Sequence, residues 1–401
     1  MKKMGAKIAL GFGNNIDYEI VWNSKIIEAL ITKYNIQAGE INSELEITSE
    51  RHLVVSILYF LQLGSGGERF VAEPMIVEQF VERFQKKSTL GGTSVRAAVV
   101  MHKLGQRTAL HLVTKNDDVR RLIPPYSAYV SSNSTDTVYP HLIVQFDQGT
   151  RVKANDIYIE VPRANRIIYH HDIDNIAMNL NPNFGKLITE SQVLLISGFN
   201  AMQSEELLSK RLRSLAQILT NLPQGALIFY EDAGFYDSSL GTVLYPFLAR
   251  YAHVFSLNED ELQSHIGRKI DVLDPHQVSE ALADLYYKIP IPTIVVHTMY
   301  WALAYGNGAS LFADALQGGT TMATTRFCYG DEFTLTNYKE VGQLPYHTDG
   351  ARFAVEIRQL LGNNVCCIAV ARVAQRNATT IGLGDAFVGG FLEAFVAQSS
   401  V

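Results

Sequence analysis

The chain has 401 residues, of which 47% are hydrophobic and 18% are charged, and its formal net charge at pH 7 is -6. This length exceeds that of one small core and predicts a large domain joined to a smaller one. A negative net charge without any basic block argues against nucleic-acid and membrane-surface partners.

Cysteine usage and hydropathy are typical of a protein of the reducing cytoplasm. The chain has 3 cysteines, and two of them, Cys366 and Cys367, are adjacent in an apolar run, so neither a disulfide framework nor a zinc site is expected. No apolar run reaches membrane-spanning length. The basic N-terminus leads only into a short apolar stretch, residues 8–13, which predicts a buried strand rather than a secretory signal.

Polar side chains follow this first apolar stretch. Asn15 and Asp17 come directly after it. Side chains of this kind at a strand end can bind vicinal sugar hydroxyls or can shape a turn, and the residues alone leave both interpretations open. A dinucleotide-binding dehydrogenase is disfavoured, because residues 11–13 lack the third glycine of the fingerprint and no acidic residue is well placed at a second strand end.

Two glycine pairs farther along would let a ligand approach the backbone closely. Residues 66–67 precede Glu68, and Gly91 and Gly92 precede a helical pattern over residues 95–104. A loop that opens a helix offers free backbone N–H groups to an anion or a hydroxyl. Glycine pairs also occur in simple turns, which is the alternative interpretation.

Residues 126–171 differ in pattern from the rest of the chain. Partly alternating apolar residues predict strands over residues 137–146 and 157–161, with a turn at residues 147–150 between them. We expect these strands and other N-terminal segments to form a smaller β-rich lid. The expected division gives residues 18–89 and 126–171 to the lid, and residues 1–17, 90–125 and 172–401 to a large α/β domain.

The end of this expected lid carries Arg163 and Arg166 on either side of Asn165. Guanidinium groups bind phosphate and carboxylate oxygens bidentately, which suits an anionic ligand. A pair of surface charges is the alternative interpretation.

The second half of the chain alternates apolar runs with amphipathic helical patterns, such as the leucine stripe of residues 208–222. This alternation predicts a doubly wound, mainly parallel sheet covered on both faces, in which ligands bind beyond the carboxyl ends of the strands. The expected strands are residues 193–196, 226–229, 254–257, 293–296 and 366–370. The polar residues that follow the first four are Ser197 and Gly198, Glu231 and Asp232, Asn258 to Glu261, and His297 and Thr298.

Asn258 and Glu261 lie three residues apart, where a helix is expected to begin. At this spacing both side chains face one side of the first turn and could together hold a hydrated Mg²⁺. The same pair could form a capping box, in which each side chain bonds the backbone of the other. Glu231, at a neighbouring strand end, suits a metal–phosphate site or a solvated loop.

Residues 380–387 form the most informative segment of the chain. Gly382 and Gly384 precede Asp385, and an apolar helical pattern follows. A tight loop that runs into a helix N-terminus is favourable for a phosphate. An aspartate seated there could take a proton from an attacking hydroxyl. A helix-capping aspartate in a glycine-rich turn is the alternative interpretation.

Taken in order, these segments resemble the ADP-dependent sugar kinase family, the glucokinase and phosphofructokinase branch of the ribokinase-like superfamily. The resemblance runs through most of the chain. The similar segments are Asn-x-Asp at residues 15–17, Gly-Gly-Glu at 66–68, the glycine pair at 91–92, Pro-Arg-Ala-Asn-Arg-Ile-Ile at 162–168, Glu231, Asn-x-x-Glu at 258–261, His-Thr at 297–298 and Gly-x-Gly-Asp at 382–385.

The resemblance implies a Mg²⁺-dependent kinase that moves a phosphoryl group from a nucleotide, expected to be ADP, to a hydroxyl of a sugar or sugar phosphate. It implies Asp385 as the base, with the backbone around Gly382 and Gly384 stabilising the transferred group. The other implied roles are Mg²⁺ binding by Glu231, Asn258 and Glu261, nucleotide binding by Arg166, His297 and Thr380, and acceptor binding by Asn15, Asp17, Glu68, Gly91 and Gly92.

Two positions depart from the family's pattern. Phe229 stands where the family usually carries a histidine, and Thr93 stands where glucokinases tend to carry a glutamine. An ATP-dependent carbohydrate or nucleoside kinase therefore stays open as an alternative, and so does a catalytically silent sugar-binding or regulatory protein of the same fold. The presence of Asp385, Asn258 and Glu261 disfavours the silent protein.

Overall fold

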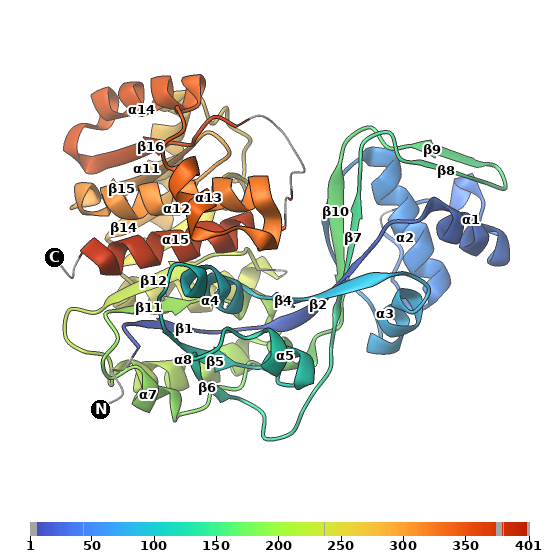
Figure 1. The fold of residues 1–401 in the computed structure, drawn as a ribbon, viewed down its shortest axis with the longest axis horizontal. Helices are drawn as coiled ribbons and strands as arrows, with labels where there is room; N and C mark the ends of the chain where they lie inside the picture. The colour runs from blue at the N-terminus through green and yellow to red at the C-terminus, as the bar shows by residue number, and fades with distance from the viewer. Residues whose placement is uncertain (1–5, 43, 236, 374–378, 380, 399–401) are drawn as a thin grey trace.

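The computed structural model of the protein describes residues 6–42, 44–235, 237–373, 379 and 381–398. Over these residues the chain forms a nine-stranded sheet in a large α/β part and a five-stranded sheet in a smaller part, called the large sheet and the small sheet below (Figure 1). The large sheet consists, from edge to edge, of β16 (Val365–Ala369), β15 (Trp301–Gly306), β14 (Thr293–His297), β13 (Val254–Asn258), β12 (Leu227–Glu231), β11 (Val193–Ile196), β1 (Ile8–Leu10), β5 (Thr108–Leu112) and β6 (Ala128–Ser131).

The large sheet is mainly parallel, as the sequence predicts. Neighbouring strands run parallel from β6 to β14, whereas β15 is antiparallel to both β14 and β16. The five apolar runs of the second half each form a strand. The sequence analysis missed β15, because it follows β14 after a tight turn in which the Thr298 hydroxyl accepts from the backbone N–H groups of Tyr300 and Trp301.

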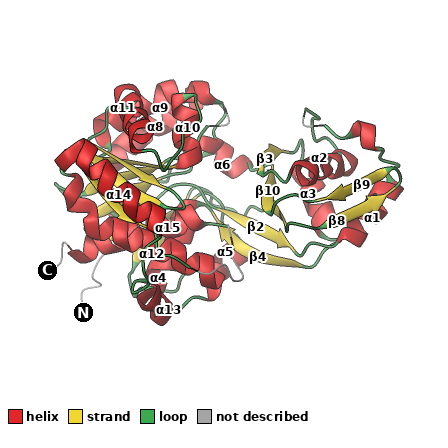
Figure 2. Ribbon diagram, turned by 90° about the horizontal axis from the view of Figure 1, so that it is seen from above, coloured by secondary structure: helices red, strands yellow, loops and turns green. Residues whose placement is uncertain are grey.

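Helices cover both faces of the large sheet (Figure 2). One face packs against α8 (Glu205–Leu219), α9 (Gly241–Tyr251), α10 (Glu259–Ile266), α11 (Pro275–Lys288) and α14 (Thr348–Leu361), and the other against α4 (Thr93–Lys103), α5 (Asp117–Leu122), α12 (Ala313–Tyr329) and α15 (Leu383–Gln398). The leucine stripe predicts α8 correctly: Ser204 caps it and Leu208, Leu212 and Leu215 are buried, but Leu222 lies beyond its end. No helix in the described part is long and apolar enough to span a membrane.

The small sheet consists of β3 (Gly67–Phe70), β10 (Asn165–His170), β7 (His141–Phe146), β2 (Asn15–Ile20) and β4 (Lys86–Gly91), in that order. Its apolar side packs against α1 (Ser24–Lys33), α2 (Glu50–Leu63) and α3 (Pro74–Val81), together with a hairpin of β8 (Arg151–Ala154) and β9 (Ile157–Glu160). Shorter helices elsewhere are α6 (Ile173–Ala177), α7 (Phe184–Leu187) and α13 (Leu335–Val341).

The strands expected over residues 126–171 form only in part. The first expected strand begins at His141 rather than at residue 137. The second pairs with the unpredicted strand β8 in the hairpin, outside the small sheet. The strand β6 lies in the large sheet, although its residues fall within the range expected for the lid, and β2 lies in the small sheet. Residues 11–14 therefore lead the chain directly from the large sheet to the small one (Figure 1).

Close backbone packing fixes α15 against α12. A Cβ atom added at Gly318 would lie 2.6 Å from the carbonyl oxygen of Gly390 and 2.6 Å from Cβ of Ala394. At Gly390, an added Cβ would lie 2.4 Å from the carbonyl oxygen of Gly318. The two helices can be this close only because neither glycine has a side chain. The start of α15, which carries Asp385, is thereby held in place.

This packing predicts that Gly318→Ala destabilises the protein. Alanine gains about 1 kcal/mol of helix propensity over glycine, but overpacking against a backbone costs about 1–3 kcal/mol. We expect a net loss in the free energy of unfolding, measured by denaturant titration. Gly39→Ala is the control, because a Cβ atom at Gly39 meets nothing within 4 Å. Equal stability of the two variants would contradict the packing interpretation.

Candidate active site

A cavity of about 1220 Å³ lies between the carboxyl ends of the large-sheet strands and the open face of the small sheet. The four predicted strand ends, at residues 197–198, 231–232, 258–261 and 297–298, all line it. Most small-molecule sites have volumes of about 300–1,000 Å³. This cavity therefore has room for two ligands side by side.

The cavity brings together most of the residues that the sequence singled out. Those that line it are Asn15, Asp17, Glu68, Gly92, Arg166, Glu231, Asn258, Glu261, His297, Gly382, Gly384 and Asp385. Gly91 lies behind the wall, where an added Cβ atom would come within 2.3 Å of Asn15 Nδ2 and 2.5 Å of Asp17 Oδ1. Its lack of a side chain leaves room for these two polar groups. Thr380 lies outside the described residues.

The glycine-rich loop runs directly into α15, as the sequence predicts. Gly382 has a φ of 66°, a left-handed conformation that glycine adopts readily. Asp385 lies in the first turn of α15, and the backbone N–H of Ala386 donates to the Gly382 carbonyl at 3.0 Å. The first backbone N–H groups of a helix have no partner within the helix, so this end of the cavity is favourable for an anion.

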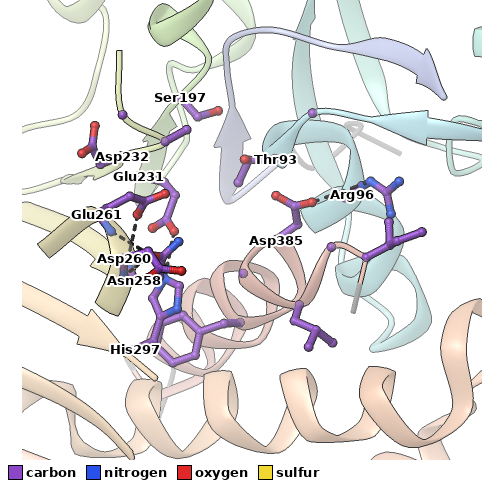
Figure 3. A pocket seen from close by; sticks show the side chains of 18 of the residues that line it. Thr93, Arg96, Ser197, Glu231, Asp232, Asn258, Asp260, Glu261, His297 and Asp385 are labelled. Carbon is purple, nitrogen blue, oxygen red and sulfur yellow. Dashed lines mark hydrogen bonds and ion pairs between the residues drawn. The ribbon is translucent and has the colours of Figure 1, made fainter. Parts of the chain in front are cut away.

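Arg96, which the sequence analysis did not single out, lies between two of the candidate carboxylates. Its Nη2 is 2.7 Å from Asp17 Oδ2. Its Nε is 3.6 Å from Asp385 Oδ2, and Figure 3 shows these two side chains facing each other. The side chain is buried. Although burial opposes its charge, Asp17 and Asp385 raise the pKa of Arg96 above its ordinary value. One feature of the sequence could have identified Arg96: it is a charged residue among the apolar residues of the helical pattern 95–104.

The small sheet and the segment that follows it supply a polar wall, called the polar wall below. It consists of Asn15, Asp17, Glu68, His141, His170 and Asp172. Asp17 Oδ1 accepts a hydrogen bond from Asn15 Nδ2 at 2.5 Å, and Glu68 is more than half exposed. His141 Nε2 lies 3.0 Å from Asp172 Oδ2. The sequence analysis missed both of these residues, because they become neighbours only when β7 and α6 come together.

Two stacked histidines stand in this wall. The rings of His141 and His170 lie 4.7 Å apart. Burial and the neighbouring His141 lower the pKa of His170 to about 3. Burial also opposes charge on His141, but the hydrogen bond and the negative charge of Asp172 outweigh it and raise the pKa of His141. The surroundings thus favour the cationic form of His141 and the neutral form of His170.

On the opposite side of the cavity, Asn258 and Glu261 form the capping box. Asn258 Oδ1 accepts from the backbone N–H groups of Asp260 at 2.8 Å and Glu261 at 3.0 Å. Glu261 Oε2 accepts from the backbone N–H of Asn258 at 2.8 Å. The capping interpretation is therefore correct, and it leaves Oε1 of Glu261 outside the cap. The cap holds both side chains rigidly at the cavity (Figure 3).

Glu231 completes an acidic cluster with Asp232 and Glu261. Glu231 Oε1 lies 3.0 Å from His297 Nε2, whereas its Oε2 is buried without a hydrogen-bond partner in the described part of the chain. Burial raises the pKa of Glu231. Burial, followed by the charges of Asp232 and Glu231, raises that of Glu261 strongly. A cation would stabilise the ionised forms of these groups.

The carboxylate oxygens of this cluster are suited to bind a cation through bridging water molecules. No group of three or more His, Cys, Asp or Glu side chains among the described residues is arranged to hold a metal ion directly. Mg²⁺ prefers oxygen ligands and keeps several of its waters. The unpartnered Oε2 of Glu231 and the remaining oxygen of Glu261 are therefore compatible with a hydrated Mg²⁺.

Comparison with known proteins establishes the family. A sequence model described as the ADP-specific phosphofructokinase/glucokinase conserved region matches residues 6–392. The chain belongs to this family. The resemblance seen in the sequence is thus confirmed, and the family is one of sugar kinases that transfer a phosphoryl group to an alcohol.

Relatives of known name and structure agree with this assignment. The ADP-dependent glucokinase of Bos taurus is 23% identical over 426 residues, covering 95% of this chain and 82% of its own. A phosphofructokinase from Pyrococcus horikoshii OT3, solved with AMP, has a TM-score of 0.78 at 18% identity and covers 99% of both chains. An ADP-dependent kinase in complex with fructose-6-phosphate and ADPβS has a TM-score of 0.73 at 14% identity, covering 98% of this chain and 94% of its own. The structural neighbours show that the fold is shared.

Apolar side chains also line the cavity. Met299, Phe327 and Val370 line it, and the ring of His297 stacks on Phe387 with centroids 4.5 Å apart. Arg166 enters the cavity from β10 of the small sheet. Burial lowers its pKa, and its guanidinium has no ion-pair partner in the part of the chain that the structure describes. A half-buried cation of this kind is stabilised by an anionic ligand.

The pairing of His141 with Asp172 predicts a measurable change in titration. In Asp172→Asn, the side chain that raises the pKa of His141 most becomes neutral, while Asp17 and Glu68 still act against burial, so the pKa of His141 should fall from its raised value. Asparagine keeps an oxygen for the backbone N–H of Asn175. Histidine NMR with ¹³C label would report the change. Asp118→Asn, a carboxylate paired with Arg121 away from the cavity, should leave His141 unaffected.

Proposed function

We propose that the protein transfers a phosphoryl group from ADP to a hydroxyl group of a sugar, with the help of Mg²⁺. The observation that carries this proposal is the place of Asp385. It lies at the N-terminus of α15, in one cavity with the carboxylates of the small sheet and with the half-buried Arg166. A base between an acceptor site and a phosphate site is the arrangement that hydroxyl phosphorylation requires.

In this mechanism the chain's own residues position the reactants. Asn15, Asp17, Glu68 and the backbone at Gly92 bind the acceptor so that one hydroxyl faces Asp385. Asp385 takes the proton of that hydroxyl as it attacks. The backbone N–H groups that follow Gly382 stabilise charge on the transferred group.

The nucleotide occupies the side of the cavity formed by the large sheet. Arg166 binds the phosphates, and His297 lies near them at the end of β14. The resemblance also assigns Thr380 to nucleotide binding, and this assignment is part of the proposal. A Mg²⁺ ion held by Glu231 and Glu261 through waters, next to Asn258, would neutralise phosphate charge during transfer.

ADP is the donor that the family and its relatives favour. The family description names ADP, and a similar kinase was solved with an ADP analogue. ATP is the alternative donor. The small sheet with its helices would act as the lid, closing over both ligands and excluding water. We place the protein in the cytoplasm, because Cys328, Cys366 and Cys367 all lie in the described part and form no disulfide.

Among sugar acceptors, we expect the polar wall to favour an uncharged sugar over a sugar phosphate. Asp17, Glu68 and Asp172 would repel the phosphate of a sugar phosphate. The nearby cation Arg96 already pairs with Asp17 and Asp385. His141 pairs with Asp172. Carboxylates accept hydrogen bonds from sugar hydroxyls, so a neutral sugar satisfies this wall better than an anion does.

A screen of donors against acceptors tests the proposed function. The wild-type protein would be incubated with Mg²⁺, with ADP or ATP, and with unphosphorylated sugars, sugar phosphates and nucleosides. We expect transfer from ADP to an unphosphorylated sugar, detected as AMP formation that depends on the acceptor. Preference for ATP would select the alternative donor, and a sugar phosphate as the best acceptor would overturn the charge interpretation. No transfer with any pair would support the catalytically silent protein.

Removal of the proposed base should abolish turnover without loss of binding. Asp385→Asn keeps the shape of the side chain but cannot accept the proton, so we expect kcat to fall by about 10²–10⁴-fold. The Kd for ADP, measured by calorimetry, should change little. Asp349→Asn, on the exposed start of α14, is the control. Turnover by Asp385→Asn at the wild-type rate would refute the assignment of the base.

The Mg²⁺ proposal predicts a shifted metal requirement. Glu261→Gln keeps an oxygen for the capping box but removes the charge, so transfer should need more Mg²⁺ for half-maximal rate, by about tenfold. Glu280→Gln, on the exposed side of α11, should show the wild-type requirement. Chelation of Mg²⁺ should stop the reaction in all three proteins. A Glu261→Gln variant with an unchanged Mg²⁺ dependence would remove Glu261 from the metal site.

A further inference from the structure

The loop that carries Asp385 is held on its other side by a second buried arginine. Arg326 of α12 is buried, and its Nε donates to the backbone carbonyl of Ile381 at 2.8 Å. Ile381 directly precedes Gly382. Arg326 does not line the cavity, so it holds the loop from outside the site of the ligands.

Arg326 is joined to the small sheet through Asp331. Arg326 Nη1 bonds Asp331 Oδ1, and the other oxygen, Oδ2, lies 2.8 Å from Nζ of Lys87 in β4. Although burial opposes its charge, Arg326 and Lys87 hold the pKa of Asp331 well below its usual range. Lys103 of α4 donates to the backbone carbonyls of Asp331 and Phe333, which fixes this turn against the large part.

Strand β4 is the direct neighbour of the strand that binds the acceptor. It pairs antiparallel with β2, in a register that places Lys87 opposite Glu19 and Thr89 opposite Asp17. The side chain of Thr89 also donates to Glu19 at 2.6 Å. A shift of β2 on acceptor binding would therefore move β4, and with it the ammonium group of Lys87.

We propose that Lys87, Asp331 and Arg326 are positioning residues that connect the acceptor-binding strands to the loop of Asp385. The inference rests on the proposed function, because it assigns the acceptor to β2. The link complements Arg96, which joins Asp17 of β2 to Asp385 directly. The loop is thus held at both ends by arginines that are each tied, through a carboxylate, to the same pair of strands.

None of the three residues lines the cavity, so a variant that breaks the link should change kcat and the nucleotide KM in different ways. Its loss should misplace Asp385 without removing any contact to the nucleotide. A displacement of about 1 Å at a reacting group can lower the rate by about 10²-fold. We therefore expect a lower kcat with a nearly unchanged KM for the nucleotide.

Lys87→Met and Asp331→Asn break the link from its two ends. We expect kcat to fall by about tenfold or more in each, and the double variant to be no slower than Asp331→Asn alone, because both changes break one link. Lys87→Arg should restore kcat to within about twofold, since the ion pair is kept. Lys87 is an exposed residue, so its variants are expected to fold even where Asp331→Asn does not.

Lys33→Met is the matched control. Lys33 also lies in the smaller part, pairs with a carboxylate (Glu50, 3.6 Å) and is 53% exposed, against 56% for Lys87. It has no connection to the loop. Its kcat should equal that of the wild-type protein.

Hydrogen exchange gives a readout that does not depend on activity. The backbone N–H of Ala386, which donates to the Gly382 carbonyl, should exchange faster in Lys87→Met than in the wild-type protein or in Lys33→Met. If the wild-type protein transferred no phosphoryl group, the proposed function would fail while this measurement still tested the link. If the wild-type protein were active and Lys87→Met matched Lys33→Met in both kcat and exchange, the link would be overturned.

Discussion

The charge of Arg96 is the interaction on which the rest of the cavity depends. Without a cation between them, the carboxylates of Asp17 and Asp385 would bring two negative charges to the same cavity, and their repulsion would oppose the approach of the small sheet to α15. With Arg96 in place, its guanidinium forms one ion pair with Asp17 of the small sheet and another with Asp385 of the large part. The glycine pair before α4 serves this arrangement, because it brings the start of the helix close to β2.

Most of the cavity follows from the architecture of the large sheet. Parallel strands end at one edge, so polar residues that are far apart along the chain meet there. Helix α10 begins directly after β13, and its cap holds the last side chain of that strand in place. Asn258 and Glu261 illustrate the result. Their hydrogen bonds to the backbone cap the start of α10, and the same bonds fix the two side chains in place on one side of the cavity.

The sequence predicted those parts of the structure that depend on local pattern. Continuous apolar runs predict the buried strands, and the strand ends then predict four segments of the cavity. Other residues depend on tertiary contact and were missed. His141 becomes a candidate only when Asp172 is beside it, and Arg96 only when Asp17 and Asp385 flank its helix. The strand β8 was missed, and alternation along residues 157–161 predicted a strand there without saying which strand it would pair with.

The polar wall and the side of the cavity formed by the large sheet come from separate stretches of the chain. The polar wall is built before residue 177, and the four strand ends opposite it all follow residue 196. Arg166 of β10 is the exception, because it lies in the first stretch but is proposed to bind the nucleotide. Substitutions in the first stretch, other than at Arg166, can therefore change the shape and charge of the polar wall. The strand ends on the opposite side keep their residues. Proteins with this fold can therefore change their acceptor specificity while they keep the residues proposed for phosphoryl transfer. The two stretches of the chain can therefore evolve under different selection, the first for the acceptor and the second for the transfer reaction.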